Sequence, residues 1–94
     1  MKAHELLQQS ACTLNQRGEQ NGYDKAEERS AAAIASLFNA KTGRNLTEAE
    51  AWQFLICLKE VRLMRQVVNG SDTSDTLIDL ISYQALLAEC LSPQ

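Results

Sequence analysis

The sequence lacks the features that mark several large classes of protein. Aromatic residues make up only 5% of its 94 residues, so the core has to be aliphatic. The four glycines are isolated at positions 18, 22, 43 and 70, so there is no glycine-rich loop to bind phosphate. No apolar run approaches the ~20 residues that a membrane helix needs, and the N-terminus is polar where a signal peptide would be apolar. We therefore expect a cytoplasmic protein without a membrane segment.

Cysteine and histidine are too few and too scattered for most nucleophilic or metal chemistry. Cys12, Cys57 and Cys90 are odd in number and show no Cys-x-x-Cys spacing, so we expect buried, reduced thiols rather than zinc ligands or a redox pair. The single histidine, His4, lies near a terminus that is expected to fray. Catalysis by a Ser-His or Cys-His pair is therefore not expected.

Charge and length limit the partners of the chain. Nine Lys and Arg against twelve Asp and Glu give a net charge of -3, which disfavours broad binding to a nucleic-acid backbone. A domain of this length buries only about 60 to 65% of the surface that its unfolded chain exposes, so a monomer would have modest stability. We expect one helical domain over residues 1–94 that forms a homo-oligomer.

Apolar spacing predicts an all-α fold of four helices, because no stretch alternates apolar and polar residues and no internal repeat is visible. An N-terminal helix is expected to precede a core of about residues 17–91. The expected helices cover residues 2–16, 26–42, 47–69 and 75–91.

Local signals set the ends of these helices. Thr47 and Glu50 have the spacing of a capping box, in which each side chain accepts a hydrogen bond from the backbone of the other. Gly43 and Gly70 stand where left-handed C-terminal caps belong. The turn before the second helix carries a single aromatic residue, Tyr23.

The third helix is expected to be long, largely apolar and the most buried element. A projection at about 100° per residue places apolar side chains around most of its circumference and leaves Gln53 and Glu60 as a narrow polar stripe. Such a helix is central in the fold or lies at a subunit interface, and Trp52 should be packed. The second helix is expected to turn its core face inward with Ala31, Ile34, Leu37 and Phe38.

Lys59 and Arg62 lie on the third helix among apolar neighbours, where cations need partners. In one interpretation they reach the surface or form structural ion pairs, with Glu27 or Asp79 as the carboxylate. In the other interpretation they bind an anion such as a phosphate. The ligand-binding set would then be Tyr23, Lys59, Arg62, Asp79 and Tyr83.

Carboxylates support an enzymatic alternative. Asp75 and Asp79 are four residues apart on a helix, and such a pair can hold Mg²⁺ together with substrate phosphates. The same two residues also suit the first turn of a helix, where the helix dipole favours acidic side chains. If the protein is an enzyme, the expected metal ligands are Glu27, Glu28, Asp75 and Asp79.

Four blocks of residues carry a family resemblance over residues 17–89. They are Arg17-Gly18 with Gly22-Tyr23, then Glu27 to Ser30 through Phe38-Asn39-Ala40 and Thr42-Gly43, then Leu46-Thr47 with Leu58-Lys59 and Val61-Arg62, then Asp75, Asp79 and Tyr83. With these blocks the chain resembles an uncharacterised family of small proteins from tailed bacteriophages and prophages. The resemblance implies a phage accessory protein that acts inside an infected bacterium, and it implies no known reaction.

More distantly, the layout resembles the all-α MazG-like nucleotide pyrophosphohydrolases, in which a Glu-x-x-Glu pair and a later Glu-x-x-Asp pair hold magnesium. The nearest matches in this chain are Asp24 with Glu27, and Asp75 with Asp79. The second pair is spaced by four residues rather than three, the two pairs lie further apart, and Lys59 and Arg62 occupy the helix between them. These departures weigh against hydrolysis but not against a nucleotide pocket.

Three hypotheses follow. The first is a non-catalytic, homo-oligomeric phage protein that needs no cofactor and binds a nucleotide or other phosphorylated ligand, so that it sequesters a host defence signal. The second is a Mg²⁺-dependent MazG-like nucleotide pyrophosphohydrolase. The third is a protein-binding module that inhibits a host factor and whose charged residues form structural pairs.

Overall fold

The computed structural model describes residues 1–20 and 30–92, and for residues 16–20 it describes the backbone alone. The regular structure in these residues is helical throughout, which confirms the predicted all-α class with four helices. None of the described helices is long and apolar enough to cross a membrane. The elements in chain order are α1 (Ala3–Gln20), α2 (Ser30–Thr42), α3 (Glu48–Asn69) and α4 (Ser74–Leu91).

The ends of α3 follow the predicted local signals. The Thr47 hydroxyl accepts a hydrogen bond from the backbone N–H of Glu50 at 3.1 Å, and the Glu50 carboxylate accepts one from the N–H of Thr47 at 2.9 Å. Gly70 ends the helix in the left-handed region, with φ of 69°. Gly43 does the same just beyond α2, with φ of 72°. The expected capping box and both expected C-terminal caps are confirmed.

The N-terminal region departs from the expected helix ends. α1 continues to Gln20 instead of stopping near residue 16. An isolated glycine such as Gly18 costs a helix only about 1 kcal/mol, so it does not have to end one. The expected start of the second helix near residue 26 and the expected turn at Tyr23 lie outside the described residues.

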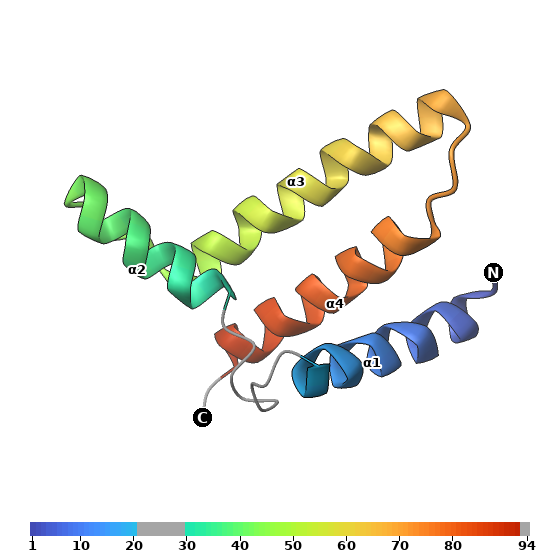
Figure 1. Ribbon diagram of the computed structural model, residues 1–94, viewed down its shortest axis with the longest axis horizontal. Coiled ribbons are helices and arrows are strands. Elements are labelled where there is room, and N and C mark those ends of the chain that lie inside the picture. The colour runs from blue at the N-terminus through green and yellow to red at the C-terminus, as the bar shows by residue number, and fades with distance from the viewer. Residues whose placement is uncertain (21–29, 93–94) are drawn as a thin grey trace.

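The most buried helix of the described fold is α4, although α3 and α4 each pack against two other helices. α4 packs against α3 on one side and α1 on the other, whereas α2 packs against α3 alone among the described helices. Figure 1 shows α1, α4 and α3 side by side, with α2 crossing the N-terminal end of α3. Six residues of α4 are buried and three of α3. The prediction that the third helix is the most buried element is therefore wrong for the single chain.

The core lies where α3 meets α4. Trp52 is only 2% exposed, and its ring packs at 51° against the ring of Tyr83, with 5.4 Å between the centroids. The predicted packing of Trp52 is thus confirmed. The other buried residues of this core are aliphatic, as the scarcity of aromatics predicts: Ala31, Ala35, Ala51, Ile56, Leu86 and Leu87.

Helix α2 buries only small residues. Ala31 and Ala35 are buried against α3, whereas Ile34, Leu37 and Phe38 are 41%, 60% and 40% exposed. The expected core face of this helix is therefore wrong for its three large residues, because α2 has one helical neighbour in the described fold and turns them away from it.

Two serines allow α1 to lie close to α4. Ser10 and Ser82 are 3% and 1% exposed, and both hydroxyls donate to the carbonyl oxygen of Ile78, at 3.4 Å and 2.9 Å. Small residues where helices touch let the backbones approach, and the shared carbonyl satisfies both buried hydroxyls. This contact fixes α1 on the side of α4 opposite to α3.

Candidate functional site

Lys59 lies on the side of α3 that faces α4 and forms an ion pair with Asp79. Its Nζ atom donates to Asp79 Oδ2 at 2.8 Å, and the two side chains are 15% and 12% exposed. At this distance the hydrogen bond is charge-assisted and joins two helices across a mostly dry contact. The geometry matches the structural interpretation of Lys59, with Asp79 as the carboxylate.

Two aromatic rings complete this site. The Lys59 ammonium lies 5.9 Å from the centroid of the Tyr83 ring, which is within the range of cation–π attraction. The Tyr83 ring also packs against the ring of Trp52. Two residues of α3 and two of α4 therefore form one connected group, which we call the Lys59 cluster: Trp52, Lys59, Asp79 and Tyr83.

The Lys59 cluster is suited to hold α3 against α4. A phosphate that approached Lys59 would also meet the Asp79 carboxylate, whose negative charge repels it. Binding would require the phosphate to replace that carboxylate, and a buried charge left without its partner is costly. The arrangement therefore favours a structural ion pair over an open anion site.

The other expected ligand residues do not join the cluster. Arg62 is exposed, although it lies only one turn beyond Lys59 on α3. Tyr23 lies outside the described residues. Of the five predicted ligand residues, the structure brings three together, namely Lys59, Asp79 and Tyr83.

The expected magnesium ligands are not brought together in the described residues. Asp75 is exposed, whereas Asp79 is buried and bound to Lys59, so the two carboxylates face different surroundings. Glu27 and Glu28 lie outside the described part of the chain. Within residues 1–20 and 30–92, no three His, Cys, Asp or Glu side chains are grouped closely enough to hold a metal ion.

Two of the three cysteines lie away from the core. Cys12 and Cys57 are exposed, whereas Cys90 is half-buried and packs against the core. The expectation of buried thiols is wrong for the first two. Cys57 is exposed because it lies on the side of α3 opposite to Trp52, away from α4.

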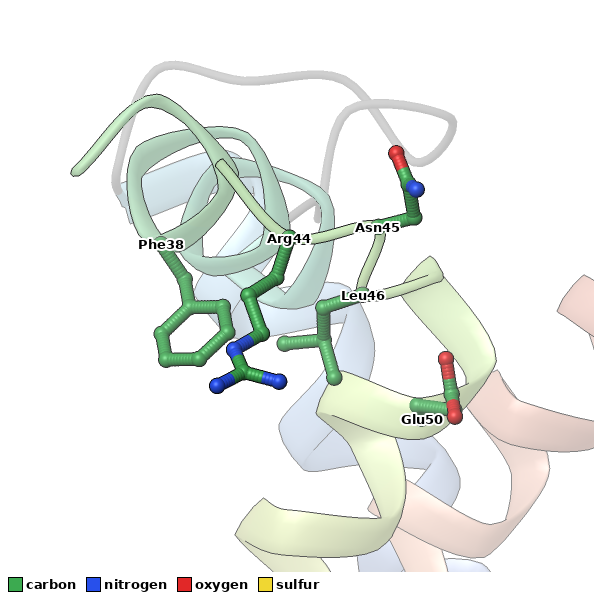
Figure 2. Close-up of a pocket in the computed structure, with 5 residues that line it drawn as sticks. All are labelled: Phe38, Arg44, Asn45, Leu46 and Glu50. Carbon is green, nitrogen blue, oxygen red and sulfur yellow. The ribbon is translucent and has the colours of Figure 1, made fainter. Parts of the chain in front are cut away.

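An open hollow of about 210 Å³ lies where the chain passes from α2 to α3. Figure 2 shows the Arg44 guanidinium between the side chains of Phe38 and Leu46. Asn39 holds this loop in place by exchanging two hydrogen bonds with the backbone of Leu46, at 2.9 Å and 2.7 Å. Glu50 also lines the hollow but already serves the capping box. Arg44 is therefore the charged group that this hollow offers, and the sequence analysis did not identify it.

A larger feature is the apolar surface on the side of α3 that faces away from α4. Its five large apolar side chains are each 44 to 85% exposed. A hollow of about 250 Å³, lined by Met64, Arg65, Val68 and Asn69, lies at its C-terminal end. We call this surface the outer face of α3, and it consists of Phe54, Cys57, Leu58, Val61, Met64 and Val68.

The sequence indicated that the third helix is apolar around most of its circumference, but not which side of it is exposed. Apolar residues around most of α3 indicated either a central helix or a subunit interface. In the described residues α3 packs against both α4 and α2, and its outer face is still exposed, which agrees with a surface of association.

The fold and these two sites define a small all-α domain with a closed ion-pair cluster inside and an apolar helix face outside. The chain belongs to the family described as a domain of unknown function (DUF6378), which it matches over residues 5–91. This match spans both the Lys59 cluster and the outer face of α3, and it confirms the expected membership of an uncharacterised family. No curated protein and no solved structure matches the chain.

Proposed function

We propose that this protein is a non-catalytic helical module that works by protein–protein association, and that it associates with a second copy of itself through the outer face of α3. The observation that carries the proposal is the exposure of five large apolar side chains along one side of one helix. A scattered apolar residue on a surface is normal, but a continuous apolar face marks an interaction site.

The outer face is large enough for an interface. A fully exposed residue between Val and Phe in size presents roughly 150 to 220 Å², so an exposure of 44 to 85% on five such residues amounts to about 600 Å². A stable interface of standard size takes about 800 Å² from each partner. The polar residues that flank the apolar side chains would supply the remainder.

The whole chain exposes more surface than its mass predicts. Its accessible surface is 6595 Å² at 10.4 kDa, whereas the area of a folded monomer of this mass is about 5,400 Å². Its radius of gyration is 14.5 Å, against about 12 Å for a compact chain of this length. Pairing of two outer faces would remove much of this excess, which supports a second copy as the partner.

A matched pair of variants tests this proposal by light scattering. Val61→Glu places a charge in the middle of the outer face and should convert the dimer to a monomer, with the helical content of the chain unchanged. Gln84→Glu introduces the same side chain at an exposed position of α4 and should leave the dimer intact. A wild-type protein that stays monomeric at 100 µM, or a Val61→Glu variant that dimerises as well as Gln84→Glu, would refute the proposal.

We keep ligand binding as a second candidate because Arg62 is exposed one turn from Lys59, and the Lys59 ammonium lies over the Tyr83 ring. In this proposal the protein sequesters a nucleotide or other phosphorylated signal. A nucleotide at about 100 times its dissociation constant should stabilise the fold by roughly 2.7 kcal/mol, and Arg62→Ala should abolish that gain. Mononucleotides, dinucleotides and cyclic nucleotides that leave the melting curve unchanged would rule it out.

We do not propose the magnesium-dependent hydrolase, since Asp79 is bound to Lys59 and Asp75, one turn before it on α4, is exposed. The biological setting that we propose is an accessory protein of a phage or prophage in the bacterial cytoplasm. It is supported by the sequence resemblance over residues 17–89 and is tested by locating genes of this family within phage and prophage genomes.

A further inference from the structure

We infer that two copies of the chain pair through α3 as a parallel, two-stranded coiled coil whose heptad positions lie on the outer face. This inference rests on the proposed function and adds to it the direction and register of the pairing. It also assigns a role to two charged residues, Glu60 and Arg65, that flank the apolar side chains.

The outer face has the seven-residue spacing of a coiled coil. Phe54, Val61 and Val68 follow one another at intervals of seven and are 65%, 44% and 85% exposed. Cys57 and Met64 lie three residues after the first two and are also exposed. These five residues occupy the a and d positions of a heptad repeat, whose side chains meet those of a second helix.

The residues at the a positions agree with two strands. In parallel coiled coils β-branched residues at a favour a dimer when leucine is at d; two of the three a positions here are valine, and the d positions hold Cys57 and Met64. Leu58 follows the d position at Cys57 and widens the apolar face to the size found above. The partner would also fill the hollow that Met64 and Val68 line.

The charges beside the apolar face select the parallel direction. Glu60 is at a g position and Arg65 at the next e position, five residues later. In a parallel pair, Glu60 of each copy lies beside Arg65 of the other, so both contacts are attractive. In an antiparallel pair, g lies beside g and e beside e, so Glu60 would meet Glu60 and Arg65 would meet Arg65. Opposite charges across the interface therefore require parallel helices.

The neighbouring helices leave the outer face exposed. α4 and α1 both lie on the other side of α3, and with α2 packed against the N-terminal end of α3, Phe54 and Leu58 are still 65% and 45% exposed. A two-fold axis along α3 would place the helices in the order α1, α4, α3 and then α3, α4, α1 of the second copy. The Lys59 cluster would remain inside each copy, because it lies between α3 and α4.

Cross-linking at Cys57 tests the direction and the register together. In a parallel dimer the two Cys57 thiols share one d layer, so a short bismaleimide should link them. The full-length protein with Cys12→Ser and Cys90→Ser retains Cys57 as its only thiol. We expect a covalent dimer that disappears when Val61→Glu is added. A dimer by light scattering that gives no Cys57 cross-link would overturn the parallel register while the proposed association stands. A monomer would refute both.

A charge swap tests the assignment of Glu60 and Arg65. Glu60→Arg and Arg65→Glu should each weaken dimerisation about three- to tenfold, because each turns two attractive contacts into repulsive ones. The double variant Glu60→Arg with Arg65→Glu restores both contacts and should dimerise like the wild type. In an antiparallel pair, the single variants would only exchange one like-charge contact for another. Single variants that dimerise as well as the wild type would therefore contradict the inference.

Discussion

The ion pair between Lys59 and Asp79 shows how a single partner determines the role of a half-buried lysine. A lysine among apolar residues had two possible roles, and a carboxylate at 2.8 Å gives it a partner inside the fold. The sequence named Asp79 as one of two candidate partners and left Glu27 as the other, because both project from predicted helices that flank the third. The sequence could not predict that Lys59 is half-buried and Arg62 exposed, because a helical projection does not show which residues of α3 the neighbouring helix covers.

Replacing one residue of this ion pair should lower the free energy of unfolding more than replacing both. Lys59→Met removes the ammonium that lies 2.8 Å from the Asp79 carboxylate, which is 12% exposed, and we expect a loss of about 2 to 4 kcal/mol in the free energy of unfolding. The double variant Lys59→Met with Asp79→Leu removes both charges and should recover most of that loss. Urea denaturation of the three proteins measures both effects. Equal stability of wild type and Lys59→Met would show that the pair contributes nothing.

Gln66 offers a site where stability can rise. Its amide oxygen is buried and has no hydrogen-bond partner in the described part of the chain. Replacing an unsatisfied buried polar group by an apolar one of similar size should stabilise the protein by about 1 kcal/mol. We expect a higher urea midpoint for Gln66→Leu, whereas Gln53→Leu, at an exposed position of the same helix, should change little. A lower midpoint for Gln66→Leu would mean that the oxygen has a partner.

For these helices, the sequence predicts where a helix begins and ends better than it predicts which side of the helix is buried. The capping box at Thr47 and the glycine cap at Gly70 depend on residues within one turn, so local chemistry suffices to place them. The buried face of α2 depends on which helices lie beside it, and the chain has only α3 there in the described fold. Periodicity alone therefore assigned Ile34 and Leu37 to a core that does not reach them.

The capping box should contribute measurably to α3. Thr47→Ala removes the acceptor for the Glu50 N–H and should lower the free energy of unfolding by about 1 kcal/mol. Thr47→Ser keeps a hydroxyl at this position and serves as the control. The two variants can be compared by thermal unfolding, and an equal loss in both would show that the hydroxyl is not the cause.

The start of α4 should respond to acid through Asp72. Its carboxylate accepts hydrogen bonds from the backbone N–H of Ser74 at 3.0 Å and from the Ser74 hydroxyl at 2.8 Å. The backbone bond, and then the side-chain bond, lower the pKa of Asp72 below its usual 3.8. The stabilisation of this turn is therefore present above pH 3.8 and is lost as the pH falls through the lowered pKa.

Carboxyl NMR titration of the folded protein measures this pKa directly. We expect the pKa of Asp72 to lie below 3.8 in the wild type. In Ser74→Ala the hydroxyl is lost but the backbone bond remains, so the pKa should return only part of the way to its ordinary value. A wild-type value at or above 3.8 would contradict the two hydrogen bonds that Asp72 accepts from Ser74.

At the scale of the molecule, the described residues form a layer of three helices with a fourth across one end, and they leave one face of α3 exposed. Composition could predict that a short chain of this kind would assemble, because its core is small. It could not predict which surface the proposed association would use, since that depends on which side of α3 the neighbouring helices leave exposed. The arrangement of the helices is thus the link between an ordinary composition and the proposed association.

Sedimentation equilibrium of the wild-type protein, from 1 to about 200 µM at pH 7, tests this central claim most directly. Burial of about 600 Å² or more of apolar surface per chain predicts a species of twice the 10.4 kDa chain mass at the upper concentrations. That species should be lost in Val61→Glu under the same conditions. A wild-type mass that stays at 10.4 kDa over the whole range would contradict the account, because the outer face of α3 would then remain exposed in solution.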